Sequence, residues 1–433
     1  MAKKEYRHSV SLDAERCIGC TSCLRQCPTE AIRIRDGHAR ITAELCIDCG
    51  NCVRVCRQKA KRAVFDKFSD ISPKYKWRIA LPAPTLYGQF DNLKDVGALI
   101  DALLDCGFDE VYEVAKAAEI ISEATRRYMR KQDIPRPVIS SACPAIVRLI
   151  RMRFPDLCDN VLPILPPVEY ASRKAKEKAL EAHPELTEKD ICTVFISPCP
   201  AKASYAKNGL SQTSSTIDYV VSISEMYLLL RDKVKRAEPG HSESQSGISG
   251  VKWASSGGES EGLFNDRYLA ADDMNNAIQV LDAIETGKFP RLEFIELNAC
   301  PGGCVGGPAT VANPYIAKSR ILGLRHGLPA SKNYLKLMDQ KPDYVPENLM
   351  VDSPIKNHIP PVRLSDDFSE AMRMMQEIDR IYEELPRIDC GSCGAPTCRA
   401  FAEDVVKGEC SFDDCVVYMR RMMQQQKTGG ETT

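Results

Sequence analysis

The sequence predicts an α/β protein with mostly parallel sheets, preceded by a small α+β cysteine-rich domain and followed by a small helical one. Three observations lead to this prediction. Between residues 75 and 300, short apolar segments alternate with segments of helical periodicity, which is typical of parallel strands joined by helices. Eight of the 20 cysteines lie between Cys17 and Cys56, and another group lies near the C-terminus. The length of 433 residues suits about two to four domains.

Charge and composition exclude several classes of protein. The 58 basic and 59 acidic residues nearly cancel, so we expect no binding of nucleic acid. There is no long apolar run and no apolar stretch typical of a secretory signal near the start. We therefore expect no membrane span and a cytoplasmic location. Because disulfides are rare in that compartment, the cysteines are expected to bind metal.

Six short apolar segments are expected as buried strands, with helices between most of them. The strands are expected at 78–82, 110–114, 138–141, 192–196, 218–221 and 292–297. The helices are expected at 93–104, 115–131, 145–154, 170–181, 224–234 and 271–286, with a later amphipathic helix at 368–385. Residues 340–361 contain prolines and few apolar residues, so we interpret them as a surface connection. The expected domains are 1–68, 75–360 and 365–433.

Two copies of the pattern C-x2-C-x2-C-x3-C lie in the first domain. They comprise Cys17, Cys20, Cys23 and Cys27, followed by Cys46, Cys49, Cys52 and Cys56. Three closely spaced thiolates and a remote fourth suit a 4Fe-4S cluster, and zinc is the alternative. The run resembles the bacterial two-cluster ferredoxins, in which the fourth cysteine of each motif ligates the other cluster. The resemblance therefore implies that Cys56 completes the first cluster and Cys27 the second. Arg57 stands where a second proline is usual.

Three further motifs follow expected strands in the α/β body. They are Ser140-Ser141-Ala142-Cys143-Pro144, Ser197-Pro198-Cys199-Pro200-Ala201-Lys202 and Ala299-Cys300-Pro301-Gly302-Gly303-Cys304. Ligand sites gather at strand ends in α/β sheets, and adjacent glycines let the backbone approach a bulky cofactor. In this order the motifs resemble the three signature motifs of the catalytic domain of FeFe hydrogenases, over roughly residues 75 to 315.

The resemblance to FeFe hydrogenases implies a cofactor, the H-cluster, and its contacts. Its 4Fe-4S part would be held by Cys143, Cys199, Cys300 and Cys304. Cys304 would also bridge to a two-iron part with CO, cyanide and azadithiolate ligands. Lys202 would contact a cyanide, as a charge-assisted donor suits a diatomic anion.

Two weaker segments resemble parts of the same catalytic domain. Ala83, Pro84 and Thr85 match a segment that touches the iron ligands. The serine- and glycine-rich run at 256–261 matches an active-domain loop, and a mobile linker is the alternative.

Four positions depart from the pattern of fast hydrogenases. Ala142 replaces a cysteine that passes protons, and Tyr205 replaces a glutamate farther along the same relay. A methyl group transfers no proton, and a phenol has a reference pKa near 10. Ser197 and Asn298 stand where methionines usually pack, which makes the pocket more polar. The departures resemble the sensory FeFe hydrogenases, in which slow chemistry on hydrogen is used as a signal.

A last cysteine cluster follows the pattern C-x2-C-x4-C-x16-C. Its members are Cys390, Cys393, Cys398 and Cys415, and the segment resembles the 4Fe-4S domain of corrinoid iron-sulfur proteins. Cys410 is the alternative fourth ligand, and zinc is the alternative metal. No metal role is assigned to Cys106, Cys158, Cys192 or Cys410.

Together these resemblances predict a ferredoxin-type hydrogenase of an anaerobe, with four 4Fe-4S clusters, one of them within the H-cluster. Low turnover is expected because of Ala142, and the expected role is hydrogen or redox sensing. Expected partners are hydrogen and protons, a redox or signalling chain, and hydrogenase maturation factors. The alternatives are an iron-sulfur electron-transfer or scaffold protein without the two-iron part, and a signalling interaction module.

Overall fold

The computed structural model describes residues 8–91, 93, 95–210, 214–236, 242–335, 340–358 and 364–429, with side chains described as far as residue 424. The chain divides into two compact units. The first comprises Met1–Cys46, Asn51–Arg62 and Ile359–Thr433, and the second comprises Ile47–Gly50 and Ala63–His358.

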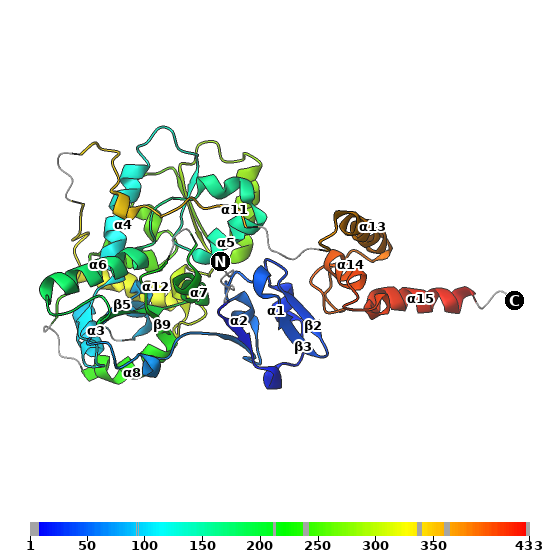
Figure 1. The fold of residues 1–433 in the computed structure, drawn as a ribbon, viewed down its shortest axis with the longest axis horizontal. Helices are drawn as coiled ribbons and strands as arrows, with labels where there is room; N and C mark the ends of the chain where they lie inside the picture. The colour runs from blue at the N-terminus through cyan, green and yellow to red at the C-terminus, as the bar shows by residue number, and fades with distance from the viewer. Residues whose placement is uncertain are drawn as a thin grey trace. The chain divides into compact units, whose positions relative to one another are not determined.

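The N-terminal part of the first unit has a small α+β fold (Figure 1, blue). Its elements are β1 (Val10–Leu12), α1 (Ser22–Arg25), β2 (Ile32–Arg35), β3 (His38–Ile41), α2 (Asn51–Val55) and β4 (Lys61–Ala63). Strands β2 and β3 form an antiparallel hairpin, whose turn residues Asp36 and Gly37 both have positive φ. A two-residue hairpin turn of type I′ needs this conformation at both positions. Leu24, Ile32 and the thiols of Cys23 and Cys52 share the core.

The C-terminal part of the first unit is helical (Figure 1, brown to red). It contains α13 (Phe368–Glu384), α14 (Cys398–Val406) and α15 (Val416–Gly429). The side chains of Asp367 and Thr397 cap α13 and α14 by accepting backbone N–H groups, which satisfies donors at the helix starts. Ile378, Ile381 and Phe401 form its core.

The second unit contains two parallel sheets. The four-stranded sheet has the order β6-β5-β8-β9 and the three-stranded sheet the order β10-β11-β7. The strands are β5 (Trp77–Pro82), β6 (Glu110–Val111), β7 (Val138–Ile139), β8 (Ile191–Ser197), β9 (Tyr219–Ser222), β10 (Tyr268–Asp272) and β11 (Phe294–Asn298). The helices are α3 (Val96–Leu104), α4 (Val114–Tyr128), α5 (Pro144–Arg153), α6 (Pro167–Ala182), α7 (Pro200–Asn208), α8 (Ile223–Arg236), α9 (Ile248–Val251), α10 (Gly258–Glu261), α11 (Met274–Glu285) and α12 (Pro314–Gly323).

Short 3-10 helices complete the described chain. They lie at Ala14–Arg16, Ala43–Leu45, Phe68–Asp70, Pro84–Gln89, Pro155–Asn160, Lys252–Ala254, Cys304–Gly306, Leu324–His326, Glu347–Leu349 and Phe412–Asp414.

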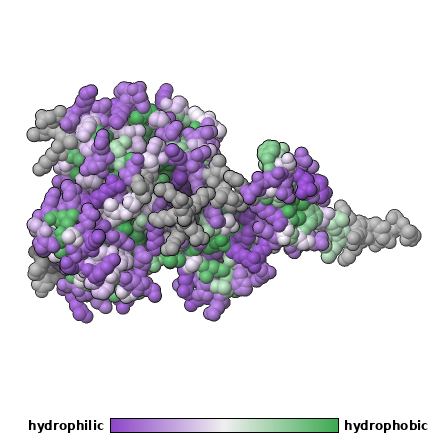
Figure 2. All heavy atoms as spheres, viewed as in Figure 1, coloured by the Kyte–Doolittle hydropathy of each residue, from purple (hydrophilic) through white to green (hydrophobic). Residues whose placement is uncertain are grey.

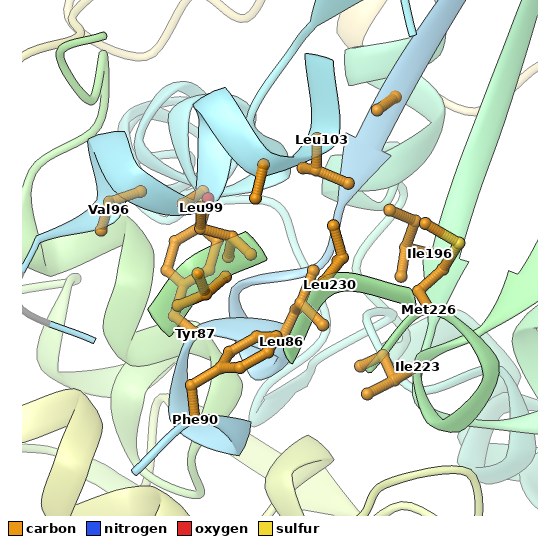
Figure 3. Packing of buried hydrophobic residues seen from close by; sticks show 14 of the residues in the cluster. Leu86, Tyr87, Phe90, Val96, Leu99, Leu103, Ile196, Ile223, Met226 and Leu230 are labelled. Atoms are coloured by element: carbon orange, nitrogen blue, oxygen red, sulfur yellow. The ribbon is translucent and has the colours of Figure 1, made fainter. Parts of the chain in front are cut away.

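Both faces of the four-stranded sheet are covered by helices. On one face, Ala80 and Ile196 pack with residues of α3, α8 and the 3-10 helix Pro84–Gln89, as Figure 3 shows for Leu86, Leu99 and Met226 among others. On the other face, residues such as Phe195 pack against α4 and α6. Burial on both faces explains why all seven residues of β8 are buried. The view in Figure 2 shows a mainly hydrophilic surface with hydrophobic residues in small separate patches.

The predicted fold class is confirmed, and several expected elements differ in extent. Strand β10 was not predicted, because 268–272 are only half buried and end in aspartates. The helix expected at 271–286 begins instead at Met274, after an aspartate cap. The strand expected at 110–114 ends at Val111, because α4 already begins at Val114.

Most of the described part of 340–361 is exposed, as expected for a surface connection, but three of its residues anchor it to the core. Val345, Leu349 and Ile355 are buried in the second unit, and Leu165 donates its N–H to the carbonyl of Leu349. Residues 359–361 lie outside the described chain.

The 256–261 run forms α10 and the turn that leads into it, rather than an irregular linker. No helix among the described residues has the length and apolar character needed to cross a membrane.

Candidate functional site

A cavity lies at the carboxyl ends of strands from both parallel sheets. Ala83, Pro84 and Thr85 follow β5, Ala142 follows β7, and Asn298 ends β11. The cavity measures about 60 Å³. It is lined by Ala83, Pro84, Thr85, Val114, Ala118, Ala142, Pro166, Pro167, Val168, Phe195, Lys202, Trp253, Ala254, Glu259, Glu296, Asn298 and Cys304. A cavity at strand ends is where α/β folds place their ligands.

Four cysteines from three motifs are brought close together beside this cavity. Cys143 precedes α5, Cys199 precedes α7, Cys300 follows β11, and Cys304 begins a 3-10 helix. Burial raises the pKa of the Cys199 thiol to about 12; Lys202 opposes that rise, and the other three cysteines add to it. Each thiol is thus within electrostatic reach of Cys199, and four converging thiols are the donor set of a 4Fe-4S cluster.

Lys202 places a cation among these thiols. Its Nζ donates to the Sγ of Cys304 over 3.3 Å. Burial disfavours the ammonium, yet the Cys304, Cys199 and Cys143 thiolates raise the pKa of Lys202 above its ordinary value. The Lys202 side chain is therefore charged at neutral pH. Its Nζ points to the Cys304 thiol, and both residues line the cavity.

The glycines of the third motif allow a close backbone approach. Gly303 has φ +91, and a Cβ there would lie 2.4 Å from the backbone nitrogen of Ser256. Only glycine fits this position. Gly302 also has positive φ, and its carbonyl accepts the N–H of Ser256 over 3.0 Å. The two glycines therefore join the Cys300–Cys304 turn to the 256–261 segment.

A pair of buried carboxyl groups lines the cavity. Glu259 and Glu296 are each only 4% exposed. Ser140 donates its Oγ–H to Glu259 over 2.6 Å, and Asn298 and the backbone N–H of Gly257 donate to Glu296 over 3.0 Å. Burial and then the repulsion from Glu296 raise the pKa of Glu259 to about 8, and burial also raises the pKa of Glu296.

The sequence pointed to only one member of this carboxyl pair. Glu259 belongs to the 256–261 segment, which resembles an active-domain loop. Glu296 was not singled out, because it lies within a strand and only the fold brings it to the cavity. The one available signal was an acidic residue within the apolar run of β11, since a buried acidic side chain needs a specific reason.

The residues expected to replace the usual proton relay lie in different places. Ala142 lines the cavity, and its N–H donates to Ser140 over 3.1 Å. Tyr205 is buried on α7 and is not among the described residues that line the cavity. Ser197 lies at the end of β8, and its Oγ accepts the N–H of Cys199 over 3.3 Å. Asn298 makes the cavity wall more polar, as expected, whereas Ser197 acts on the backbone of the cysteine motif.

The first-unit cysteines have environments suited to clusters. The Sγ atoms of Cys17, Cys27 and Cys56 accept backbone N–H groups over 3.4, 3.3 and 3.2 Å. Burial and then the Cys27 thiolate raise the pKa of Cys52 to about 12. Cys27 and Cys52 are therefore near neighbours, which fits the implied pairing of the fourth cysteine with the other motif. Cys49 lies in the second unit, in the hydrophobic cluster against which Cys143 and Cys199 pack.

The C-terminal cysteines surround a second, smaller cavity. Cys390, Cys393, Cys398 and Cys415 all line it, together with Phe401. Cys410 is not among the described lining residues, so the geometry favours Cys415 as the fourth member of this set.

The C-terminal helical part contacts the N-terminal part within the first unit. Ile34 donates its N–H to the carbonyl of Gly394 over 2.8 Å. Asp404, which is almost fully buried, accepts from Arg33 Nε over 2.7 Å and also pairs with Arg35. A Cβ on Gly391, the residue after Cys390, would lie 3.0 Å from Leu24, the residue after Cys23. Two cysteine-bearing segments from opposite ends of the chain, one of them α1, thus lie together.

The fold and these cysteine sites define an α/β iron-sulfur protein with an enclosed, partly polar cavity. Comparison with protein families agrees. The family described as the C-terminal domain of the iron-only hydrogenase large subunit matches residues 76–270 and 237–308. A 4Fe-4S dicluster domain matches residues 9–57, and a family described as an Fe-S cluster matches residues 385–417. Since the hydrogenase family covers more than half of the chain, the protein belongs to the iron-only, or FeFe, hydrogenase family.

Individual relatives and structures are similar to the chain over stretches of different length. The periplasmic Fe hydrogenase large subunit of Nitratidesulfovibrio vulgaris is 27% identical over 378 residues, which is 72% of this chain and 88% of the relative. The corrinoid/iron-sulfur protein large subunit of Moorella thermoacetica is 51% identical over 35 residues, 8% of each chain. A structure described for stepwise H-cluster assembly in an FeFe hydrogenase gives a TM-score of 0.51 at 16% identity, covering 67% of this chain and 97% of the other. An FeFe hydrogenase variant from Chlamydomonas reinhardtii gives 0.50 at 16% identity with the same coverage. At these identities the structures support the fold.

Proposed function

We propose that this protein oxidises hydrogen and reduces protons slowly at an H-cluster, and that it serves to sense hydrogen or redox state. One observation carries the proposal: the four thiols expected to hold the cluster lie near one another, Lys202 and Cys304 reach the cavity, and the position that should exchange protons there is Ala142. General acid and base steps are typically worth about 10² to 10⁴ in rate. A site with its ligands but without its first proton donor is therefore expected to turn over slowly.

The residues present fit the expected cofactor. Cys143, Cys199, Cys300 and Cys304 would hold the 4Fe-4S part, and the Lys202 ammonium would donate a charge-assisted hydrogen bond to a cyanide. Ala83, Pro84 and Thr85 line the same cavity and would enclose the cofactor. When bound, the two-iron part, with CO, cyanide and azadithiolate ligands, supplies the site of hydrogen heterolysis.

Glu259 is the proposed proton carrier at the cavity. With a pKa of about 8, its carboxyl group holds a proton at neutral pH and can exchange it near that pH. Two carboxylates on α4 are less suited. Glu123 is paired with Arg126 and Arg127. Glu119 accepts from the N–H of Gly247 and is not among the described residues that line the cavity.

The electrons would pass through the clusters of the first unit. Cys49 of the second cysteine motif lies in the hydrophobic cluster against which Cys143 and Cys199 pack, which supports electron transfer between the cluster held by that motif and the H-cluster. The contact between the Cys390 and Cys23 loops supports transfer onward to the C-terminal cluster. A redox or signalling protein would then exchange electrons there, and maturation factors would supply the two-iron part.

A second function remains in view: an iron-sulfur electron carrier or scaffold that never receives the two-iron part. The Lys202–Cys304 contact favours the hydrogenase over this alternative, because neither a carrier nor a scaffold needs a buried ammonium at that thiol.

One experiment separates the two functions. The clusters are reconstituted anaerobically, a synthetic two-iron complex is added, and the infrared bands of bound CO and cyanide are recorded under argon and then under hydrogen. Sharp bands that shift reversibly with hydrogen are expected. A protein with full cubane content and no such bands is the electron carrier or scaffold.

A further inference from the structure

Lys61 is an unusual residue in the core of the ferredoxin-like domain. It lies on β4 and is only 2% exposed. Its Nζ is buried and receives no hydrogen bond partner from any described residue. Burying an ammonium without a partner is among the most costly arrangements in a protein. Such a residue needs a compensating negative charge.

The neighbours of Lys61 identify that charge. Lys61 directly follows Ala60, whose N–H donates to the Sγ of Cys56 over 3.2 Å, and its charge also acts on the thiols of Cys23 and Cys52. Cys23 lies on α1 in the first cysteine motif, and Cys52 lies on α2 in the second. Both thiols belong to the same small core. Lys61 is therefore within electrostatic reach of one proposed ligand of each cluster.

We infer that Lys61 is the internal counter-charge of the two ferredoxin-like clusters and makes both easier to reduce. The inference rests on the proposed function, in which each motif holds a 4Fe-4S cluster. Four thiolates make a cubane anionic, and each added electron makes it more so. Net charge and burial are among the factors that set cluster potentials. A buried cation stabilises the reduced form most, because little water screens it.

Arg57 and Lys59 are close in sequence but differ in environment. Both are exposed, so solvent screens their charge. Lys59 is a matched control, since Lys59→Met and Lys61→Met remove the same charge two residues apart. If the cluster potentials responded only to the net charge of this segment, both variants would change them to the same extent.

The test uses the full chain with its clusters and follows their reduction by electron paramagnetic resonance during a redox titration. We expect Lys61→Met to lower the midpoint potentials of both ferredoxin-like clusters. The expected change in the reduced-to-oxidised ratio at fixed potential is about tenfold, or about 59 mV for a one-electron couple. Lys59→Met should leave the potentials unchanged. Equal potentials in Lys61→Met and the parent protein would overturn the inference.

A third variant separates charge from shape. Lys61→Arg keeps the charge and should retain most of the parent potential. If Lys61→Met assembles no clusters, Lys61→Arg should still assemble them; failure of both would mean that Lys61 acts through its packing, and the inference would be wrong. A parent protein that binds no cubanes in this domain would instead refute the proposed cofactor set.

Discussion

Glu259 is expected to titrate far above the range of an ordinary glutamate. Its pKa is raised from 4.5 to about 8, first by burial and then by Glu296. At 1.36 kcal/mol per unit, the shift corresponds to about 5 kcal/mol in favour of the protonated form. At pH 7 about ten molecules should therefore carry a protonated Glu259 for each that carries the carboxylate.

The sign of the effect on stability follows from the raised pKa. The contribution of Glu259 to the free energy of unfolding is complete below pH 4.5 and is lost as the pH rises toward 8. It is lost because, in this range, the folded state holds a proton that the unfolded chain has released. Between pH 6 and pH 8 the free energy of unfolding should fall by about 2 kcal/mol from this group alone. Glu259→Gln should remove that fall, since the amide does not ionise and can still accept from Ser140.

The direct assay is infrared spectroscopy of the carboxylic acid C=O stretch, followed against pH in the full chain. A band that loses half its intensity near pH 8 and is absent from Glu259→Gln is expected. Glu261→Gln serves as the control, because Glu261 lies on the same helix but is exposed and pairs with Lys252. In Glu296→Gln the midpoint should fall but remain above 4.5, since burial persists. A band that titrates near pH 4.5, or that survives in Glu259→Gln, would refute this account of the cavity.

Three further outcomes are expected. Ala142→Cys should raise the rate at which the protein exchanges hydrogen gas with deuterated water by about 10²-fold or more, whereas Ala142→Ser should raise it much less. Equal gains in the two variants would argue against a thiol relay. Cys415→Ser should lose the iron and sulfide of one cubane and Cys410→Ser should not, because only Cys415 lines the small cavity. Asp404→Asn leaves two arginines without their buried carboxylate and should cost about 3 kcal/mol. Faster hydrogen exchange at Ile34, which bonds to the C-terminal domain, would report the loss, and unchanged exchange would contradict it.

Much of the fold could be predicted because the local signals were strong. The strand at 192–196 is a run of apolar residues between polar ones, and it became β8 with every residue buried. The cysteine spacings placed three motifs at strand ends, and the structure brings them to one cavity. In both cases the chemistry of the segment itself carried the information.

The rest depended on contacts between distant segments. Glu296 meets the cavity because β11 ends beside the 256–261 segment, and no local pattern reports that meeting. The burial of Leu349 depends on packing against distant segments of the second unit, which the sequence around it does not reveal. In the sequence, Lys61 belongs to a basic run from Arg57 to Arg62, which is typical of a solvated surface. In the structure, however, its side chain on β4 is buried.

The buried charges are arranged by sign. Lys61 and Lys202 lie beside cysteines, where electrons would be stored, whereas Glu259 lies beside Ser140 and Glu296. A carboxylate in the cavity wall would oppose the arrival of an electron at the neighbouring cluster, but a protonated carboxyl group would not. Because burial keeps Glu259 protonated at neutral pH, reduction of the site and protonation of Glu259 should favour one another. Slow turnover is then compatible with a readable redox state, since the same carboxyl group that carries the proton also sets how readily the site accepts an electron.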